Sequence, residues 1–276
     1  MAAPRRRRPT RAAGNPPRPR PSEPGPVLEL EVERIAHGGV AVAHHEGRVV
    51  FVADAVPGEL VRARVVDAAR ERFWRAETVE VLRASSDRRE HVWPEAALDR
   101  SPEARAGGAE FGHIRMARQR ALKGEVLRDA LARFGGVEVD VEVDAVDAAL
   151  APGVDAEAGT GWRTRVRLHV APDGAVGPYA ARSHTVVPVA SLPLAVPELA
   201  GLAPLDRSFP GAAWIDLVAP SDGAPEVVVR DAEPHPGRGG RGGRAQRSDA
   251  ARPVVAELVG ARRFAVDRDG FWQVHR

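Results

Sequence analysis

Alternating apolar and polar residues after residue 26 predict β-strands. Residues 28–33 alternate leucine or valine with glutamate, which is typical of a strand with one buried side and one acidic, solvent-facing side. Residues 48–53 form a largely apolar run, residues 61–65 alternate again, and residues 73–82 supply a last strand. Glycine-bearing turns separate these runs at a spacing of about ten residues, so we expect a small closed β-barrel of the OB type over residues 27–84.

The period of the pattern changes after a polar connection that covers residues 85–112. From about residue 113 to residue 134, apolar residues recur at spacings of three to five, as on one face of an α-helix. These residues are Ile114, Ala117, Ala121, Val126, Ala130 and Phe134. Gly135 and Gly136 predict the end of the helix, because glycine readily adopts the left-handed conformation of a helix C-cap.

Further runs predict a mixed β region which, together with the helix, forms an α+β central domain over residues 85–276. The runs lie at residues 137–146, 162–170, 175–179, 183–189, 213–218 and 226–230. Two shorter strand-like runs surround Phe264 and Phe271. In the strand at 162–170, successive side chains alternate between two faces, so Arg163, Arg165 and Arg167 fall on one face with His169.

Two segments have the composition of disordered chain. Residues 1–26 are rich in arginine and proline, and residues 233–252 are rich in glycine and arginine, so neither has the apolar residues for a core. The tail carries seven arginines against one glutamate. We expect the tail and the loop either to bind RNA phosphates loosely or to be flexible extensions without a role. The loop arginines are Arg238, Arg241, Arg244 and Arg247.

The absence of cysteine excludes disulfides, zinc–thiolate sites and cysteine nucleophiles. The nine histidines show no spacing typical of a zinc site. No apolar stretch reaches the roughly 18 residues that a membrane span needs. The tail also lacks the apolar segment of a secretory signal. We therefore expect a cytoplasmic protein with no membrane partner and no metal site.

Arginines supply nearly all the positive charge, since Lys123 is the one lysine, and they are candidates for contacts with the phosphates and bases of a nucleic acid. The three strand arginines at 163, 165 and 167 recur about every 6.6 Å, which suits a phosphate backbone. The alternative is a solvated face paired to acidic neighbours. A second candidate face lies on the barrel and consists of Arg48, Arg62, Arg64, Arg72 and Arg75. Phe73 or Trp74 could stack on a base, but neighbouring strand residues point to opposite sides, so we expect at most one to be exposed.

Four segments, taken in order, carry a resemblance to a known family. They are the barrel ending at Arg88, the run AGGAEFGHI at 106–114 leading to Lys123, the run GWRTR at 161–165 with Gly177 and SHTVV at 183–187, and the run GFWQVH at 270–275. In this order they resemble the RNA uracil-C5 methyltransferases that carry an N-terminal TRAM domain. The resemblance implies an OB-like TRAM barrel followed by a mixed α+β central domain. The family's C-terminal Rossmann-like methyltransferase domain is missing from the chain.

The chain also departs from this family. Many members bind an iron–sulfur cluster through four cysteines, and the matching positions here are Trp93, Ala106, Ala109 and Leu192. These side chains do not ligate iron, so we expect no cluster and apolar packing in its place. In a complete member, Phe271 and Gln273 would border the pocket for S-adenosylmethionine.

The S-adenosylmethionine motif, the catalytic cysteine and the general base of the family have no counterpart in this chain. A uracil-C5 methyl transfer needs a thiolate nucleophile, so we assign no catalytic residue and expect the chain to be inactive alone. The resemblance predicts the RNA-recognition portion of a methyltransferase acting on rRNA or tRNA, truncated or completed by a separate methyltransferase domain. The alternative is an autonomous RNA-binding module without chemistry.

Overall fold

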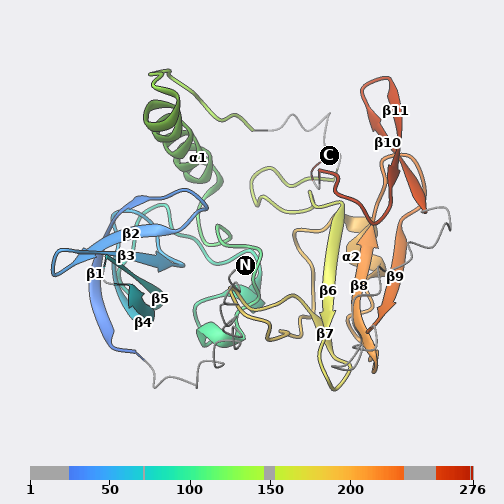
Figure 1. Ribbon diagram of the computed structural model, residues 1–276, viewed down its shortest axis with the longest axis horizontal. Coiled ribbons are helices and arrows are strands. Elements are labelled where there is room, and N and C mark those ends of the chain that lie inside the picture. The colour runs from blue at the N-terminus through green and yellow to red at the C-terminus, as the bar shows by residue number, and fades with distance from the viewer. Residues whose placement is uncertain (1–24, 71, 146–152, 233–252, 274, 276) are drawn as a thin grey trace, which may run out of the picture.

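A computed structural model of the protein describes residues 25–70, 72–145, 153–232, 253–273 and 275. The two segments expected to be disordered lie outside the described residues, apart from Gly25 and Pro26. The described chain forms a β-barrel with a helix beside it, a separate antiparallel sheet and a terminal hairpin (Figure 1). The expected fold class, an OB-like barrel followed by a mixed α+β part, is confirmed.

Five strands close the barrel in the order β1-β2-β3-β5-β4. They are β1 (Val27–Ile35), β2 (Ala41–His45), β3 (Arg48–Ala53), β4 (Leu60–Arg70) and β5 (Phe73–Arg83). Strands β3 and β5 pair in parallel, whereas the other barrel neighbours are antiparallel. Closure leaves no unpaired strand edge, which protects the barrel from pairing with other chains.

The alternation seen in the sequence sorts the barrel side chains into an inner and an outer set. Leu30 and Val32 of β1 are 1% exposed, and Val50 and Val52 of β3 have no exposed surface. The glutamates between the β1 residues face solvent. Removal of the apolar side of each strand from water is therefore the main force that closes the barrel.

Helix α1 (Met116–Ala130) completes the barrel core. Ile114, which precedes the helix, and Leu122 within it have no exposed surface and belong to the same apolar cluster as the barrel strands. The helix begins later than the expected residue 113, because Ile114 is held in a bridge with Arg88. A π-helical turn, Leu131–Gly135, follows, and Gly136 ends it at a φ of 62°, as the sequence predicted.

Two ion pairs attach the connection after the barrel to the barrel itself. Nε and Nη2 of Arg88 donate to the Glu59 carboxylate at 2.6 and 2.7 Å, and the Glu59 side chain has no exposed surface. Nη1 of Arg105 donates to Asp54 Oδ2 and to the Thr78 carbonyl, both at 2.9 Å. Two short 3-10 turns, Pro94–Ala96 and Pro102–Ala104, lie on the same connection. The junction is therefore fixed by charge-assisted hydrogen bonds as well as by apolar packing.

The second part of the chain is a four-stranded antiparallel sheet in the order β7-β6-β8-β9. Its strands are β6 (Arg165–Val170), β7 (Val176–Gly177), β8 (Ala212–Val218) and β9 (Glu226–Asp231). Leu168, Ile215 and Leu217 pack with Leu199 of helix α2 (Pro197–Leu202) in one buried cluster. A hairpin of β10 (Val254–Val259) and β11 (Arg262–Asp267) lies beyond one end of this sheet, where Ala256 forms a bridge with Asp222 of the β8–β9 turn (Figure 1).

Three expected strands do not form among the described residues. Residues 137–145 are irregular, and Val137 and Val139 are 47% and 42% exposed because no neighbouring strand pairs with them. Residues 183–189 make one isolated bridge, from Val186 to Tyr179, and Pro188 lacks the N–H that a longer ladder would need. The run around Phe271 is also not a strand.

The buried junction pair yields a first prediction. Replacing Arg88 with methionine leaves the Glu59 carboxylate buried without its cation, so we expect the free energy of unfolding to fall by about 3–5 kcal/mol. The matched control is Arg83→Met, since Arg83 pairs with Glu31 on the surface, where both side chains are more than half exposed. That substitution should cost at most about 1 kcal/mol. Urea unfolding of both variants measures the difference, and equal losses would contradict the role given to Glu59.

Candidate nucleic-acid interface

The three arginines expected in one exposed row occupy different environments. Nη2 of Arg165 donates to Glu257 at 3.2 Å and Nη1 donates to the Arg268 carbonyl at 2.7 Å, and its side chain is 12% exposed. Arg165 therefore fastens β6 to the terminal hairpin. Arg167 is exposed but forms a two-pronged pair with Asp216 of β8 at 2.7 and 3.2 Å. Arg165 and Arg167 are thus both paired with acidic residues, which was the alternative that the sequence left open. Their contact with RNA stays a prediction.

Arg163 lies before β6 and turns toward the loop at residues 108–110. Its guanidinium packs over the Trp162 ring at 4.9 Å, and its Nη2 donates to the Gly108 carbonyl at 3.3 Å. Burial lowers the pKa of Arg163 from its usual value, and Glu110 opposes this through its charge. Among the described residues Arg163 makes no ion pair, unlike the two arginines that follow it on the strand.

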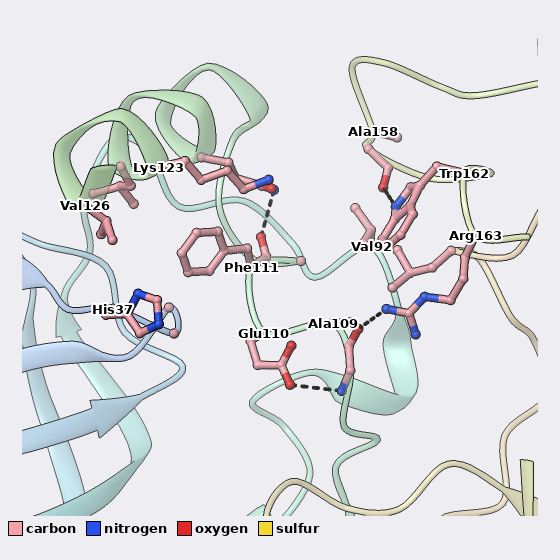
Figure 2. A pocket seen from close by; sticks show the side chains of 18 of the residues that line it. His37, Val92, Ala109, Glu110, Phe111, Lys123, Val126, Ala158, Trp162 and Arg163 are labelled. Atoms are coloured by element: carbon pink, nitrogen blue, oxygen red, sulfur yellow. Dashed lines mark hydrogen bonds between the residues drawn. The ribbon is translucent and has the colours of Figure 1, made fainter. Parts of the chain in front are cut away.

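A cavity of about 600 Å³ opens beside Arg163 between the barrel, helix α1 and the loop before β6. Figure 2 shows Phe111, Lys123 of helix α1, and the neighbouring Trp162 and Arg163 around this space. Most of the remaining wall is apolar, supplied by Val92, Ala109, Leu122, Val126, Leu127, Ala130 and Leu194. The volume and the apolar lining with few polar groups are typical of a ligand-binding cavity.

A second cavity of about 510 Å³ lies between the barrel and the sheet, and it brings Arg163 and Arg167 together. Arg182 of the following turn also lines it and is exposed. Tyr179 and His169 stack within the wall, with ring centroids 3.5 Å apart and planes 9° apart. Cationic groups beside flat aromatic rings are common in proteins that bind single-stranded nucleic acids. The sequence did not single out Tyr179 or Arg182, because the turn that carries them had no recognisable pattern.

The arginines proposed for the barrel surface separate into two groups. Arg62 pairs with Glu29 at 3.3 Å and Glu80 at 2.9 Å, on the acidic side of the barrel. Arg48 instead lies over the Trp74 ring at 4.8 Å, and Arg75 lies near two phenylalanine rings. The other two candidates are Arg72, which is exposed in the turn before β5, and Arg64, which is partly exposed within β4.

The four positions that match cluster cysteines in the resembled family come together in one place. Trp93, Ala106, Ala109 and Leu192 are between 4% and 8% exposed and belong to a single apolar cluster. None carries a thiolate, so the residues present do not fit an iron–sulfur cluster. Within the described part of the chain, no group of three histidine, cysteine, aspartate or glutamate side chains is arranged to hold a metal ion.

A buried histidine lies next to this cluster. His113 is 4% exposed, and its ring stacks near His91 with centroids 6.2 Å apart. Burial, reinforced by the charges of Arg88, His91 and Arg89, lowers the pKa of His113 to about 3. The nearby Ala55 backbone acts in the opposite direction, but neither ring nitrogen of His113 has a hydrogen-bond partner among the described residues. The imidazole is therefore neutral in the folded protein at ordinary pH.

The last described residues are open to solvent. Phe271 is 88% exposed and Gln273 is also exposed, whereas Trp272 packs against Phe264 with centroids 6.0 Å apart. The His275 ring stacks on Trp162 at 5.3 Å, which brings the end of the chain to the first cavity. The two residues expected to border a cofactor pocket therefore have no covering partner among the described residues.

Comparison with known proteins accounts for this combination of barrel and sheet. Residues 21–79 match the TRAM domain. The chain is 34% identical over 272 residues to an uncharacterized RNA methyltransferase of Streptomyces avermitilis. This match covers 91% of this chain and 61% of that protein. The chain is homologous to RNA methyltransferases. It is also 35% identical to the 23S rRNA (uracil(1939)-C(5))-methyltransferase of Halomonas elongata, over 75% of this chain and 41% of that protein.

A solved structure shows the same fold. The Pyrococcus abyssi tRNA (uracil-54, C5)-methyltransferase, in complex with S-adenosyl-L-homocysteine, matches with a TM-score of 0.50 at 16% identity. The match covers 89% of this chain and 61% of that one. The TRAM-bearing chain thus spans about three fifths of the length of its first relatives. Among the described residues, no helix is long and apolar enough to cross a membrane.

The apolar packing at the four positions that match cluster cysteines can be tested by removing the indole of Trp93. Trp93→Ala leaves a cavity where the ring packed, so we expect the free energy of unfolding to fall by about 3–5 kcal/mol. Urea unfolding measures this loss. Incubation of the original protein with iron and sulfide should produce no visible absorbance of a bound cluster, because thiolate ligands are absent. Stoichiometric iron uptake would contradict the apolar replacement.

His113 makes stability depend on pH. The unfolded chain takes up a proton near pH 6.5 while the folded protein holds its imidazole neutral down to about pH 3, so stability is lost as the pH falls between these values. Between about pH 7.5 and pH 5 this loss is about 2 kcal/mol. Urea unfolding at both values should show that His113→Leu removes this part of the pH dependence. Replacing the exposed His184 with leucine should leave it unchanged.

Proposed function

We propose that this chain is the RNA-recognition part of an S-adenosylmethionine-dependent RNA uracil-C5 methyltransferase that acts on rRNA or tRNA in the cytoplasm. The observation that carries the proposal is homology to RNA methyltransferases over 91% of the chain, with a TRAM barrel at its start. In this proposal, residues 27–84 are the TRAM domain and residues 85–276 are the central domain, with a basic tail before them.

The surface between the two proposed domains supports contact with RNA. The two cavities share Arg163, and their walls include Lys123, Arg167 and Arg182 together with stacked aromatic rings. Exposed cations draw phosphates and make binding sensitive to salt, while flat rings accept unpaired bases.

An uncovered apolar surface on the terminal hairpin supports the view that this part works with a further domain. The exposed residues are Val254 at 64%, Leu258 at 46%, Val259 at 57%, Phe264 at 39% and Phe271 at 88%. Val254 and Leu258 lie on one face of the hairpin, and Val259 and Phe264 lie on the other. Exposed apolar side chains on both faces favour an interaction with another part of the protein. In the proposed enzyme a methyltransferase domain covers this surface, and Phe271 and Gln273 border its pocket for S-adenosylmethionine. The domain also supplies the thiolate, which this chain lacks.

The alternative is an autonomous RNA-binding module. It is favoured by the closed barrel, whose core is filled by residues of this chain, Ile114 and Leu122 included. The uncovered apolar hairpin counts against it, because a module that works alone would gain nothing from exposed phenylalanine and valine.

Binding of the full chain to transcribed rRNA and tRNA fragments tests the proposal. We expect affinity that falls steeply with salt. Lys123→Gln and Arg167→Gln should each weaken binding several-fold and lower the slope of log K against log salt by about one. The matched control is Arg263→Gln, which removes an exposed arginine of the hairpin that is paired with Asp222. Lack of binding to any structured RNA at moderate salt would overturn the proposal.

A further inference from the structure

The outer surface of the TRAM barrel is electrically divided. On one side, Glu29, Glu31 and Glu33 of β1 face solvent, and each is paired with a nearby basic side chain. The pairs are Arg62 with Glu29 and Glu80, Arg83 with Glu31, and His44 with Glu33. The carboxylates of this side repel phosphate.

On the other side of the barrel, two phenylalanines meet beside two arginines. The Phe51 and Phe73 rings lie edge to face, with centroids 5.5 Å apart and planes at 74°. The Arg75 guanidinium lies 5.9 Å from the Phe51 centroid and 5.8 Å from the Phe73 centroid. Arg70 lies over Phe73 at 5.3 Å. We call these four residues the Phe51–Phe73 face.

The parallel pairing of β3 and β5 brings this face together. In the register Val49 lies opposite Phe73, and Phe51 lies opposite Arg75. Val50 and Val52, which flank Phe51 on β3, have no exposed surface and fill the barrel. Phe51 therefore points outward, because side chains alternate along a strand. Both phenylalanines remain partly exposed. The sequence predicted Phe73 as a candidate for stacking on a base. It did not indicate Phe51, because the pairing of β3 with β5 could not be read from the sequence.

The arginines of this face retain their hydrogen-bond donors. Among the described residues, neither Arg70 nor Arg75 makes an ion pair, in contrast to Arg62 and Arg83. The carboxylate opposite Arg75 belongs to Asp67, and its Oδ1 accepts from the Ala69 N–H at 3.0 Å. A guanidinium that lies over a ring keeps its edge available, so it can bind a phosphate while it stacks.

A similar arrangement lies at the adjoining end of the barrel. Arg48 lies over Trp74 at 4.8 Å, and the ring of His45 lies 6.4 Å from the same indole. Trp74 packs against the barrel core and is therefore a fixed support for Arg48. Because side chains alternate along a strand, Arg48 and Trp74 lie on the opposite face of β3 and β5 from Phe51, Phe73 and Arg75, so this pair is not part of the Phe51–Phe73 face.

We propose that the Phe51–Phe73 face binds unpaired RNA nucleotides, with bases stacking on the phenylalanine rings and phosphates held by Arg70 and Arg75. Bases inside a duplex are already stacked on one another, so a ring platform selects single-stranded segments such as loops. The proposal rests on the proposed RNA-recognition function, and it names the chemical form of RNA that the barrel takes. The acidic β1 side orients the strand by excluding it from the opposite surface.

The test compares a short single-stranded RNA with its duplex, using fluorescence anisotropy and the full chain. Phe73→Leu keeps an apolar side chain but removes the ring, so we expect about fivefold weaker binding of the single strand with an unchanged salt slope. Phe51→Leu should behave alike. Arg75→Gln should weaken binding and lower the salt slope by about one. Binding of the duplex should not respond to either phenylalanine variant.

Arg83→Gln is the matched control, because it removes one arginine from the acidic side, and it should leave binding of the single strand unchanged. Thermal unfolding of each variant establishes that the barrel remains folded. If the chain binds RNA but the two phenylalanine variants and Arg75→Gln bind it as the Arg83→Gln control does, the role of the Phe51–Phe73 face is overturned while the recognition function stands. If the arginine variant weakens binding and the phenylalanine variants do not, stacking is overturned. If the chain binds no RNA, both the face and the recognition function fail.

Discussion

The Glu59 carboxylate has no exposed surface, and it fixes the segment that leaves the barrel. It accepts hydrogen bonds from two backbone N–H groups, those of Val56 and Ser85, and from the Arg88 guanidinium. A buried carboxylate is tolerated only when its lone pairs are met in this way. The bonds define where the chain leaves β5 and hold Arg88 opposite Ile114. The position of helix α1, and with it the wall of the first cavity, follows from this arrangement.

Local patterns predicted the parts of the fold that depend on one strand or one helix. The alternation in β1 and β4 could be read because one face of each strand is buried, and the end of the helical segment could be read from Gly136. The same reasoning was wrong at residues 137–145 and 183–189, where apolar residues recur but no partner strand lies beside them. Strand pairing is a long-range property, and a local pattern does not contain it.

The candidate site shows the same limit more sharply. The sequence placed three arginines on one face of a strand, yet Glu257, more than ninety positions away, buries Arg165. Arg62 was grouped with Arg48 and Arg75 by composition, but its neighbours across the barrel are glutamates. By contrast, the four positions matching cluster cysteines were found from the resemblance, and they do lie in one apolar cluster. Which charge faces which partner was decided by tertiary contacts alone.

The barrel core depends on residues that follow its last strand. Ile114 and Leu122 are fully buried among side chains of β1, β3 and β4, although β5 ends at Arg83. During synthesis the chain emerges from its N-terminus, so five strands can pair while the apolar interior still lacks two of its largest residues. The TRAM barrel therefore reaches its final packing only after helix α1 has left the ribosome. Its cooperative folding unit is longer than its sheet, and a boundary drawn at the end of β5 would cut through that unit.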